Sequence, residues 1–364
     1  MTTTTTEAGG PALEPGEPVI ETTALRKVFR SRRGRSVVAV DDLDLTVPAG
    51  SVHGFLGPNG SGKTTTIRML LGLASITSGS ANLLGQPVPS RLPEVMPRIG
   101  AIVEEPKFTP TFTGRLNLEL VARTHGLGAA EVDRALEQVG LTGRESERFK
   151  GYSLGMKQRL AIAATLLTAP ALLILDEPTN GLDPAGIREI RDLIRSLGEQ
   201  GVTVLLSSHI LAEVEQVCST VTIVGRGRRL AEGSVAELVA GERATRVIVG
   251  DPARTDEAVA VLTRAGMGVR RDGGAVLVDD IDPAQVNETL GSNGIWAAEL
   301  TPVRRGLESV FLELTAGSGP GRMDVDLADI TGAAPPADRA QHPRQPSGQS
   351  GQSGPSGPSE GEHR

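Results

Sequence analysis

Short apolar runs recur along this chain, and their patterns predict the strands and helices of an α/β fold. Apolar or β-branched residues alternate with polar ones in two early stretches, which predicts antiparallel strands at residues 19–30 and 37–47. Later apolar runs predict further strands at residues 52–56, 99–103, 171–175 and 202–206, the third of them buried on both faces. Helical patterns lie between these runs, at residues 65–71, 114–123, 129–139 and 160–167.

A second, smaller pattern of elements follows, so we expect the chain to be divided into several parts. Residues 19–240 form the larger domain, and residues 244–316 form an α+β accessory domain. Within the accessory domain we expect strands at residues 246–249, at 275–279 and around Trp296, and helices at 256–265, at 283–290 and from Gly306. It contains no catalytic constellation, and we expect it to serve self-association or docking. Residues 1–18 and 317–364 are rich in Thr, Gly, Ser and Pro, which predicts disorder.

The composition excludes several classes of protein. Among 364 residues the net charge is −7, so no basic excess exists to neutralise a nucleic-acid backbone. The basic stretch at residues 30–35 predicts a solvated hairpin loop or, as an alternative, a contact with anionic lipid. Cys218 is the single cysteine, so an intrachain disulfide is impossible and a reducing cytoplasm is expected. No apolar run approaches the ~20 residues of a membrane helix, which predicts a soluble or peripheral protein.

The strand at residues 52–56 leads into a stretch that matches the phosphate-binding pattern G-x-x-x-x-G-K-[ST] at every fixed position. The stretch reads Gly57, Pro58, Asn59, Gly60, Ser61, Gly62, Lys63 and Thr64, with Thr65 next in the helix. Glycines let backbone N–H groups turn around a phosphate, and the helix N-terminus adds its dipole. Lys63 would reach the β- and γ-phosphates, and the Thr64 hydroxyl would bind Mg²⁺. The alternative is a glycine-rich turn before a helix.

Two carboxylates and a histidine follow later strands of the same predicted sheet. Asp176 and Glu177 end the buried strand at residues 171–175, where open α/β sheets bind their ligands. Asp176 suits Mg²⁺, and Glu177 suits polarising the water that attacks the γ-phosphate. His209 ends the next strand and is expected to contact the γ-phosphate, although an isolated histidine is more often structural. Asp183 could by itself be a turn residue or a helix cap.

Two further positions have both a structural and a functional interpretation. Ser153 stands at the head of an apolar helix, where it is either an N-cap or part of a second anion site. Phe29 closes the first strand, where it either packs on an edge strand or stacks on a nucleotide base.

Together, the motifs resemble those of the nucleotide-binding subunits of ATP-binding-cassette (ABC) transporters, over residues 19–240. Residues 57–64 match the family's phosphate loop in full. The other matches are Phe29 at the adenine-stacking position, Ser153 and Gly155 in the signature, Asp176 and Glu177 in the second carboxylate motif, Asp183 in the D-loop and His209 at the switch.

The resemblance implies a P-loop NTPase of ABC type, with a mixed-sheet core, an antiparallel β-subdomain and an inserted helical subdomain. It also implies a head-to-tail dimer, formed with itself or with a related cassette, that sandwiches two ATP molecules with Mg²⁺. Ser153 and Gly155 would then contact the nucleotide of the partner subunit. Closure on ATP and opening after hydrolysis would drive a membrane permease, which places the chain peripherally on the cytoplasmic face of the cell membrane.

Three positions depart from the family pattern. Glu104 stands in place of the Q-loop glutamine, so a metal contact there is made by a carboxylate or is not made. Leu154 and Met156 replace the first glycine and the glutamine of the signature. The segment from Tyr152 to Arg159 resembles the drug-resistance and bacitracin-resistance branch of exporters, which favours export of an antibiotic-like compound. The alternatives are a soluble ABC protein of translation or DNA maintenance, and a nucleotide sensor with little turnover.

Overall fold

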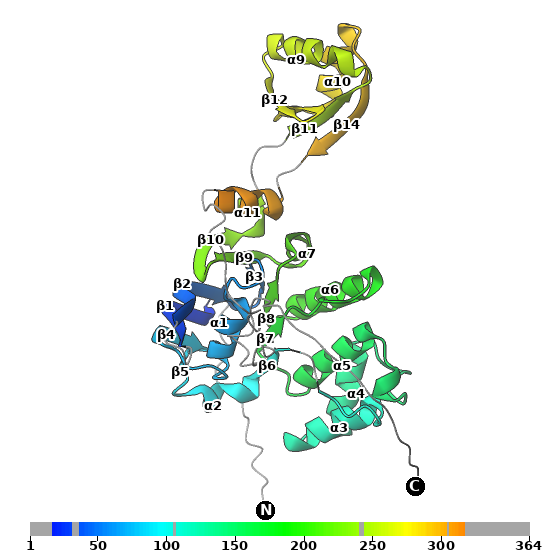
Figure 1. The fold of residues 1–364 in the computed structure, drawn as a ribbon. Coiled ribbons are helices and arrows are strands. Elements are labelled where there is room, and N and C mark those ends of the chain that lie inside the picture. Colours follow the sequence, from blue (N-terminus) through cyan, green and yellow to red (C-terminus); the bar gives the residue numbers. More distant parts are fainter. Residues whose placement is uncertain (1–16, 31–35, 105–106, 240–243, 304–305, 317–364) are drawn as a thin grey trace, which may run out of the picture. The chain divides into compact units, whose positions relative to one another are not determined.

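A six-stranded sheet lies at the centre of the larger part of the chain, with the strand order β10-β9-β3-β8-β7-β6 (Figure 1). The computed structural model describes residues 17–30, 36–104, 107–239, 244–303 and 306–316. The strands are β3 (Val52–Leu56), β6 (Ile99–Ile102), β7 (Leu172–Asp176), β8 (Thr203–Ser208), β9 (Thr220–Gly225) and β10 (Arg228–Ser234). All pairs are parallel except β9 with β10. The predicted mixed-sheet core is therefore confirmed.

A second, antiparallel sheet has the order β2-β1-β4-β5. Its strands are β1 (Pro18–Arg30), β2 (Ser36–Pro48), β4 (Ser78–Leu83) and β5 (Gln86–Val88). The predicted pairing of the first two strands is confirmed by register pairs such as Thr22 with Leu45. The loop at residues 31–35 lies outside the described residues, as do most of the N-terminal segment and the whole of the C-terminal tail that were predicted to be disordered.

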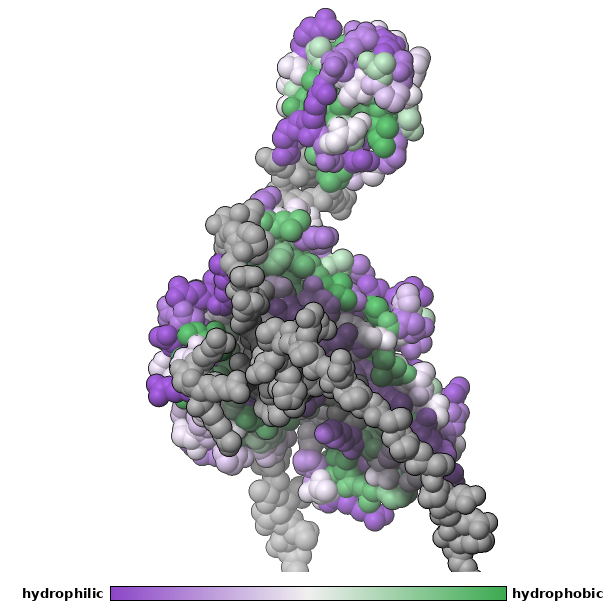
Figure 2. Space-filling model, viewed as in Figure 1, coloured by the Kyte–Doolittle hydropathy of each residue, from purple (hydrophilic) through white to green (hydrophobic). Residues whose placement is uncertain are grey.

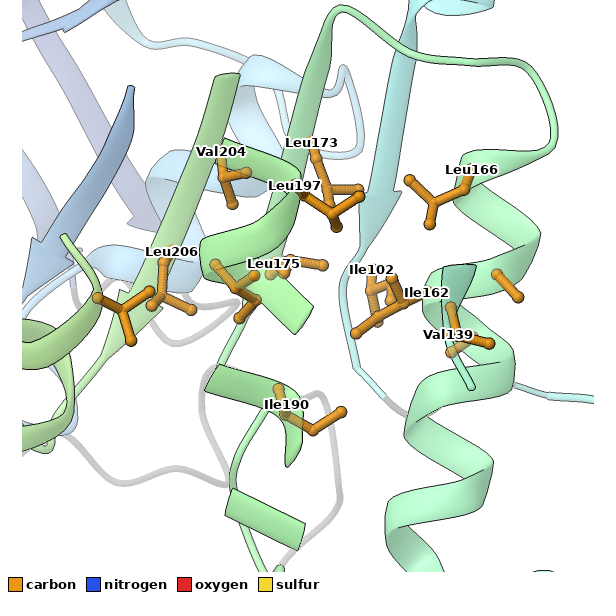
Figure 3. Close-up of a cluster of buried hydrophobic side chains, with 14 of the residues drawn as sticks. Ile102, Val139, Ile162, Leu166, Leu173, Leu175, Ile190, Leu197, Val204 and Leu206 are labelled. Atoms are coloured by element: carbon orange, nitrogen blue, oxygen red, sulfur yellow. The ribbon is translucent and has the colours of Figure 1, made fainter. Parts of the chain in front are cut away.

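Three helices of this part of the chain form an insertion between β6 and β7, and the others lie between or after the remaining strands in the sequence. Inserted are α3 (Gly114–Thr124), α4 (Ala129–Gln138) and α5 (Leu154–Leu166). The others are α1 (Lys63–Leu70), α2 (Leu92–Val95), α6 (Pro184–Glu199), α7 (Leu211–Val217) and α8 (Val235–Val239). Figure 3 shows Leu173 and Leu175 of β7 among Val204 and Leu206 of β8 and side chains from α5 and α6. None of the described helices is long and apolar enough to cross a membrane.

The register of the parallel strands determines where the functional loops emerge. Leu56 at the end of β3 lies opposite Ser208 at the end of β8, and Asp176 at the end of β7 lies opposite Ser207. Because the three strands run in the same direction, the loops that follow them leave from one edge of the sheet.

The accessory region contains a separate antiparallel sheet with the order β12-β13-β11-β14. Its elements are β11 (Ala244–Val249), α9 (Thr255–Arg264), β12 (Gly268–Asp272), β13 (Ala275–Asp279), α10 (Pro283–Ser292) and β14 (Ala297–Val303). This is a split β-α-β-β-α-β arrangement with its own buried core, which includes Val247, Leu262 and Leu290. Figure 2 shows hydrophilic and hydrophobic residues interspersed on its visible face.

Two details of the accessory region differ from the prediction. Strand β12 was not predicted, whereas the strand expected around Trp296 corresponds to β14, which begins at Ala297. The last helix, α11 (Leu307–Ala316), packs against α7 and α8 instead of against the accessory sheet. Its Leu307 and Val310 belong to the core of the larger domain. The Leu307 N–H donates to Glu215 Oε2 of α7 at 3.2 Å.

Candidate active site

The loop between β3 and α1 is packed so closely that glycine is required at two positions. A Cβ on Gly57 would lie 2.3 Å from the carbonyl oxygen of Val224 in β9. Gly62 has a φ of +104°, and its Cβ would lie 2.6 Å from the carbonyl oxygen of Ala39 in β2. The loop then continues into α1, whose first-turn N–H groups have no acceptor within the helix. Glycine therefore gives this loop the conformation that a phosphate cradle needs.

Lys63 is the buried cation of this loop. Its side chain is 5% exposed, and Nζ donates to the Gly57 carbonyl at 2.7 Å. The same Nζ lies 3.2 Å from Glu177 Oε1, so a cation from the loop and a carboxylate from the end of β7 form an ion pair. Ser61 Oγ is buried nearby in the loop and has no hydrogen-bond partner. This free hydroxyl and the N–H groups at the start of α1 fit the oxygen atoms of a bound phosphate.

Asp176, Glu177 and His209 converge at the ends of β7 and β8. His209 Nδ1 lies 2.7 Å from Glu177 Oε2. An ionised carboxylate only accepts hydrogen bonds, so Nδ1 carries the proton of this contact. Ser207 Oγ donates to Asp176 Oδ1 and accepts from the Glu177 N–H at 3.1 Å. The two carboxylates thus have different environments: Asp176 accepts from a hydroxyl, and Glu177 faces Lys63 and His209.

A cavity of about 530 Å³ joins this sheet edge to the helical insertion. Its lining from the sheet side comprises Thr64, Glu104, Asp176, Glu177, Asn180 and Gly181, and that from the insertion comprises Phe149, Leu154, Lys157 and Gln158. Thr64 and Asp176 offer a hydroxyl and a carboxylate to one cavity. Such oxygen donors fit Mg²⁺, which takes one or two carboxylates and completes its coordination with water and phosphate. In the described part of the chain, no three His, Cys, Asp or Glu side chains form a metal site by themselves.

Glu104 lines the same cavity and has an ion-pair partner. It adopts a positive φ of 71°, and its carboxylate pairs with the guanidinium of Arg68 from α1. Both side chains are more than a third exposed. Arg68 therefore neutralises the carboxylate that replaces the expected glutamine.

Ser153 and Asp183 both cap helices, as their structural interpretation predicted. Ser153 Oγ accepts from the Met156 N–H at 3.2 Å at the start of α5, and Asp183 Oδ1 accepts from the Gly186 N–H at 3.1 Å at the start of α6. A Cβ on Gly155 would lie 3.8 Å from Gly186 Cα, so the starts of α5 and α6 are close together. These contacts leave the nucleotide role of Ser153, Gly155 and Asp183 a prediction.

Phe29 lies on β1, where a lysine of the same strand is its neighbour. The Phe29 ring is not part of the cavity lining, and Lys27 Nζ lies 4.9 Å from the ring centroid. Lys27 Nζ also donates to the Ser75 carbonyl at 2.6 Å. Phe29 therefore forms a cation–π contact on its own strand, and its stacking on a base stays a prediction.

Two residues of this site were missed by the sequence analysis. Ser207 Oγ contacts the Asp176 carboxylate and the Glu177 backbone N–H, and its place between an apolar strand and His209 was a signal that could have been used. Arg68 pairs with a residue 36 positions away, and no local pattern indicates that pairing.

Comparisons with known proteins agree with this geometry. A family model described as "ABC transporter" matches residues 40–180. The bacitracin transport ATP-binding protein BcrA of Bacillus licheniformis is 39% identical over 82% of this chain and 98% of its own length. The daunorubicin resistance ATP-binding protein DrrA3 of Streptomyces coeruleorubidus is also 39% identical, over 76% of this chain and 91% of its own length.

A solved structure of the ATP-binding subunit of an ABC transporter is 29% identical, with a TM-score of 0.53. It covers 60% of this chain, and the match includes 91% of the solved chain. The resemblance stated from the motifs is thereby confirmed, as is the fold class. The chain belongs to the ATP-binding subunits of ABC transporters, which hydrolyse ATP to drive transport.

Proposed function

We propose that this subunit powers the export of a drug or antibiotic-like compound by a separate membrane permease. The proposal is supported by the two relatives named for bacitracin transport and daunorubicin resistance, which this chain matches over nearly their whole length. The chain would bind the permease peripherally, on the cytoplasmic face of the cell membrane.

The ion pair and hydrogen bond that join Lys63, Glu177 and His209 carry the proposed site chemistry. Lys63 binds the β- and γ-phosphates, and ATP binding exchanges its Glu177 partner for phosphate oxygens. Glu177 is then available to polarise the attacking water, while His209 holds the carboxylate in place and lies near the γ-phosphate. Thr64 and Asp176 are the side chains that would hold Mg²⁺, which when bound neutralises charge on the phosphates. Glu104 is neutralised by Arg68, so its contact with the metal would be weaker than that of Asp176.

The nucleotide-binding site is completed by a second subunit, which is either another copy of this chain or a related cassette. In the described chain, the start of α5 faces the cavity through Leu154, Lys157 and Gln158. Ser153 and Gly155 at this helix start are proposed to bind the γ-phosphate of the partner's ATP, because a helix N-terminus is a ready anion site. Phe29 is proposed to stack on the adenine, and Asp183 to contact the nucleotide across the dimer.

Co-purification from the native membrane tests the transport role. The tagged chain is extracted gently, and the proteins that accompany it are identified. Lys63→Ala, which removes the side chain proposed to bind the phosphates, is the control. We expect a multi-helix permease in stoichiometric yield, and we expect cells without this chain to become more sensitive to the exported compound. Ribosomes or DNA-repair proteins in place of a permease would contradict the proposal.

A further inference from the structure

Glu213 is a buried carboxylate that the site described above does not use. It lies in the first turn of α7, four residues after His209, and is 8% exposed. The one hydrogen-bond partner that the structure names for its carboxylate is Thr179, whose Oγ1 donates to Glu213 Oε2 at 2.7 Å. Thr179 is itself only 6% exposed. In the described part of the chain, no lysine, arginine or histidine lies within ion-pair distance of Glu213.

Packing alone does not account for a carboxylate at this position. Taking a charge out of water is costly, and a single hydroxyl donor offsets only part of that cost. The start of α7 adds a favourable dipole, but this effect is modest for one acidic residue. An apolar residue of similar volume commonly serves as well for stability at such a buried site. The carboxylate therefore indicates a specific need for the contact with Thr179.

The contact joins the same two chain segments that the catalytic pair joins. Glu177 and Thr179 belong to the loop after β7, while His209 and Glu213 belong to the segment that leads into α7. The two bonds have the same length, 2.7 Å from His209 Nδ1 to Glu177 Oε2 and 2.7 Å from Thr179 Oγ1 to Glu213 Oε2. Ser207 at the end of β8 already holds the Glu177 N–H at 3.1 Å, and the bond from Thr179 to Glu213 fixes the loop at a further point, two residues after Glu177.

The loop that holds Glu177 and Thr179 is a tight turn. Holding Thr179 in place therefore also restricts the position of Glu177. The Asn180 N–H donates to the Glu177 carbonyl at 3.1 Å, and the Leu182 N–H donates to the Thr179 carbonyl at 3.2 Å. Glu177 adopts a φ of +49°, a conformation that non-glycine residues adopt only when their surroundings hold them in it.

We propose that Glu213 is a positioning residue for ATP hydrolysis, acting through Thr179 to hold Glu177 beside His209. This role rests on the proposed part of Glu177 in polarising water. Glu213 touches neither the nucleotide nor the water; it sets the orientation of the loop that carries Glu177.

Steady-state ATPase assays of the full-length chain test this role. We expect Glu213→Ala to lower kcat by roughly tenfold to a hundredfold, as loss of a supporting partner commonly does, with KM for ATP unchanged within about twofold. Glu213→Gln keeps an oxygen that can accept from Thr179 and should restore most of the rate. The matched control is Glu215→Ala, which removes a carboxylate from the same helix where it contacts α11.

A double-mutant cycle separates positioning from general stability. Thr179→Val should reproduce the loss of kcat, Thr179→Ser should not, and Glu213→Ala combined with Thr179→Val should be no slower than the slower single variant. If the losses of kcat in the two single variants multiply in the double variant, the proposal is overturned. A wild-type kcat in Glu213→Ala would also overturn it. A loss that Glu213→Gln fails to rescue and that follows the melting temperature would also overturn it. If Glu177→Gln keeps full turnover in the same assay, the proposed base fails instead.

Discussion

Lys63 and Glu177 illustrate how single residues determine this site. Each is a charge in a partly or wholly buried position, and their separation of 3.2 Å lets each neutralise the other. The sequence predicted both residues and their separate roles from motifs of fixed spacing. It could not predict their ion pair, because that depends on how closely the end of β7 approaches the loop after β3.

His53 provides a pH-dependent prediction at the residue scale. It lies in β3, 1% exposed, with its ring nitrogens 2.9 and 3.0 Å from the hydroxyls of Thr220 and Thr222. Burial lowers its pKa to about 4. The pKa of His53 in the unfolded state is about 6.5. At pH values between about 4 and about 6.5 only the unfolded state takes up the proton, so the free energy of unfolding falls as the pH falls.

We expect this one residue to remove about 2 kcal/mol of stability between about pH 7 and pH 5. Chemical denaturation of the wild type and of His53→Gln at both pH values measures it. Glutamine can still hydrogen-bond the two threonines but does not titrate, so the variant should lose less stability on acidification. An equal loss in both proteins would show that His53 does not titrate in this way.

The elements were predicted well where burial is complete and poorly where it is partial. Strands β7 and β8 are buried along almost their whole length and have apolar runs, so their positions followed from the sequence. Strand β12 reads Gly-Val-Arg-Arg-Asp and is mostly exposed at the edge of its sheet, so no apolar alternation marks it. The strand predicted around Trp296 is β14, which begins at the next residue, while Trp296 itself is 70% exposed.

Helix α11 shows that chain order does not decide which core an element joins. Leu307 is fully buried in the core of the larger domain. We expect Leu307→Ala to lower the free energy of unfolding of this domain by about 2–5 kcal/mol, because it removes buried methyl groups and leaves a cavity.

The same truncation at Leu73, which is 67% exposed, is the matched control and should change stability by less than about 0.5 kcal/mol. Thermal unfolding of the full-length chain with and without ATP compares them. Equal stability of Leu307→Ala and wild type would mean that α11 does not support the ATPase core.

At the scale of the whole molecule, the proposed cycle requires two subunits. In that cycle one chain would supply the phosphate loop, Glu177 and His209, and the start of its α5 would offer an anion site to another chain. The sequence predicted these separate roles of the two subunits only through family resemblance. Ser153 caps its own helix in the structure, and no local sequence pattern distinguishes a helix cap from a ligand contact. The dimer is therefore the part of the account that most needs a measurement.

That measurement is the molar mass of Glu177→Gln in solution, by light scattering, with and without ATP. Glutamine removes the proposed general base, and a general base commonly contributes about 10²–10⁴-fold to a rate. We expect the variant still to bind ATP, because Lys63 and the phosphate loop are unchanged. We predict a monomer without ATP, a stable dimer with it, and a return to monomer when Ser153→Ala is added to the variant. A variant that stays monomeric with ATP and hydrolyses it at the wild-type rate would contradict both the catalytic role of Glu177 and the ATP-driven dimer.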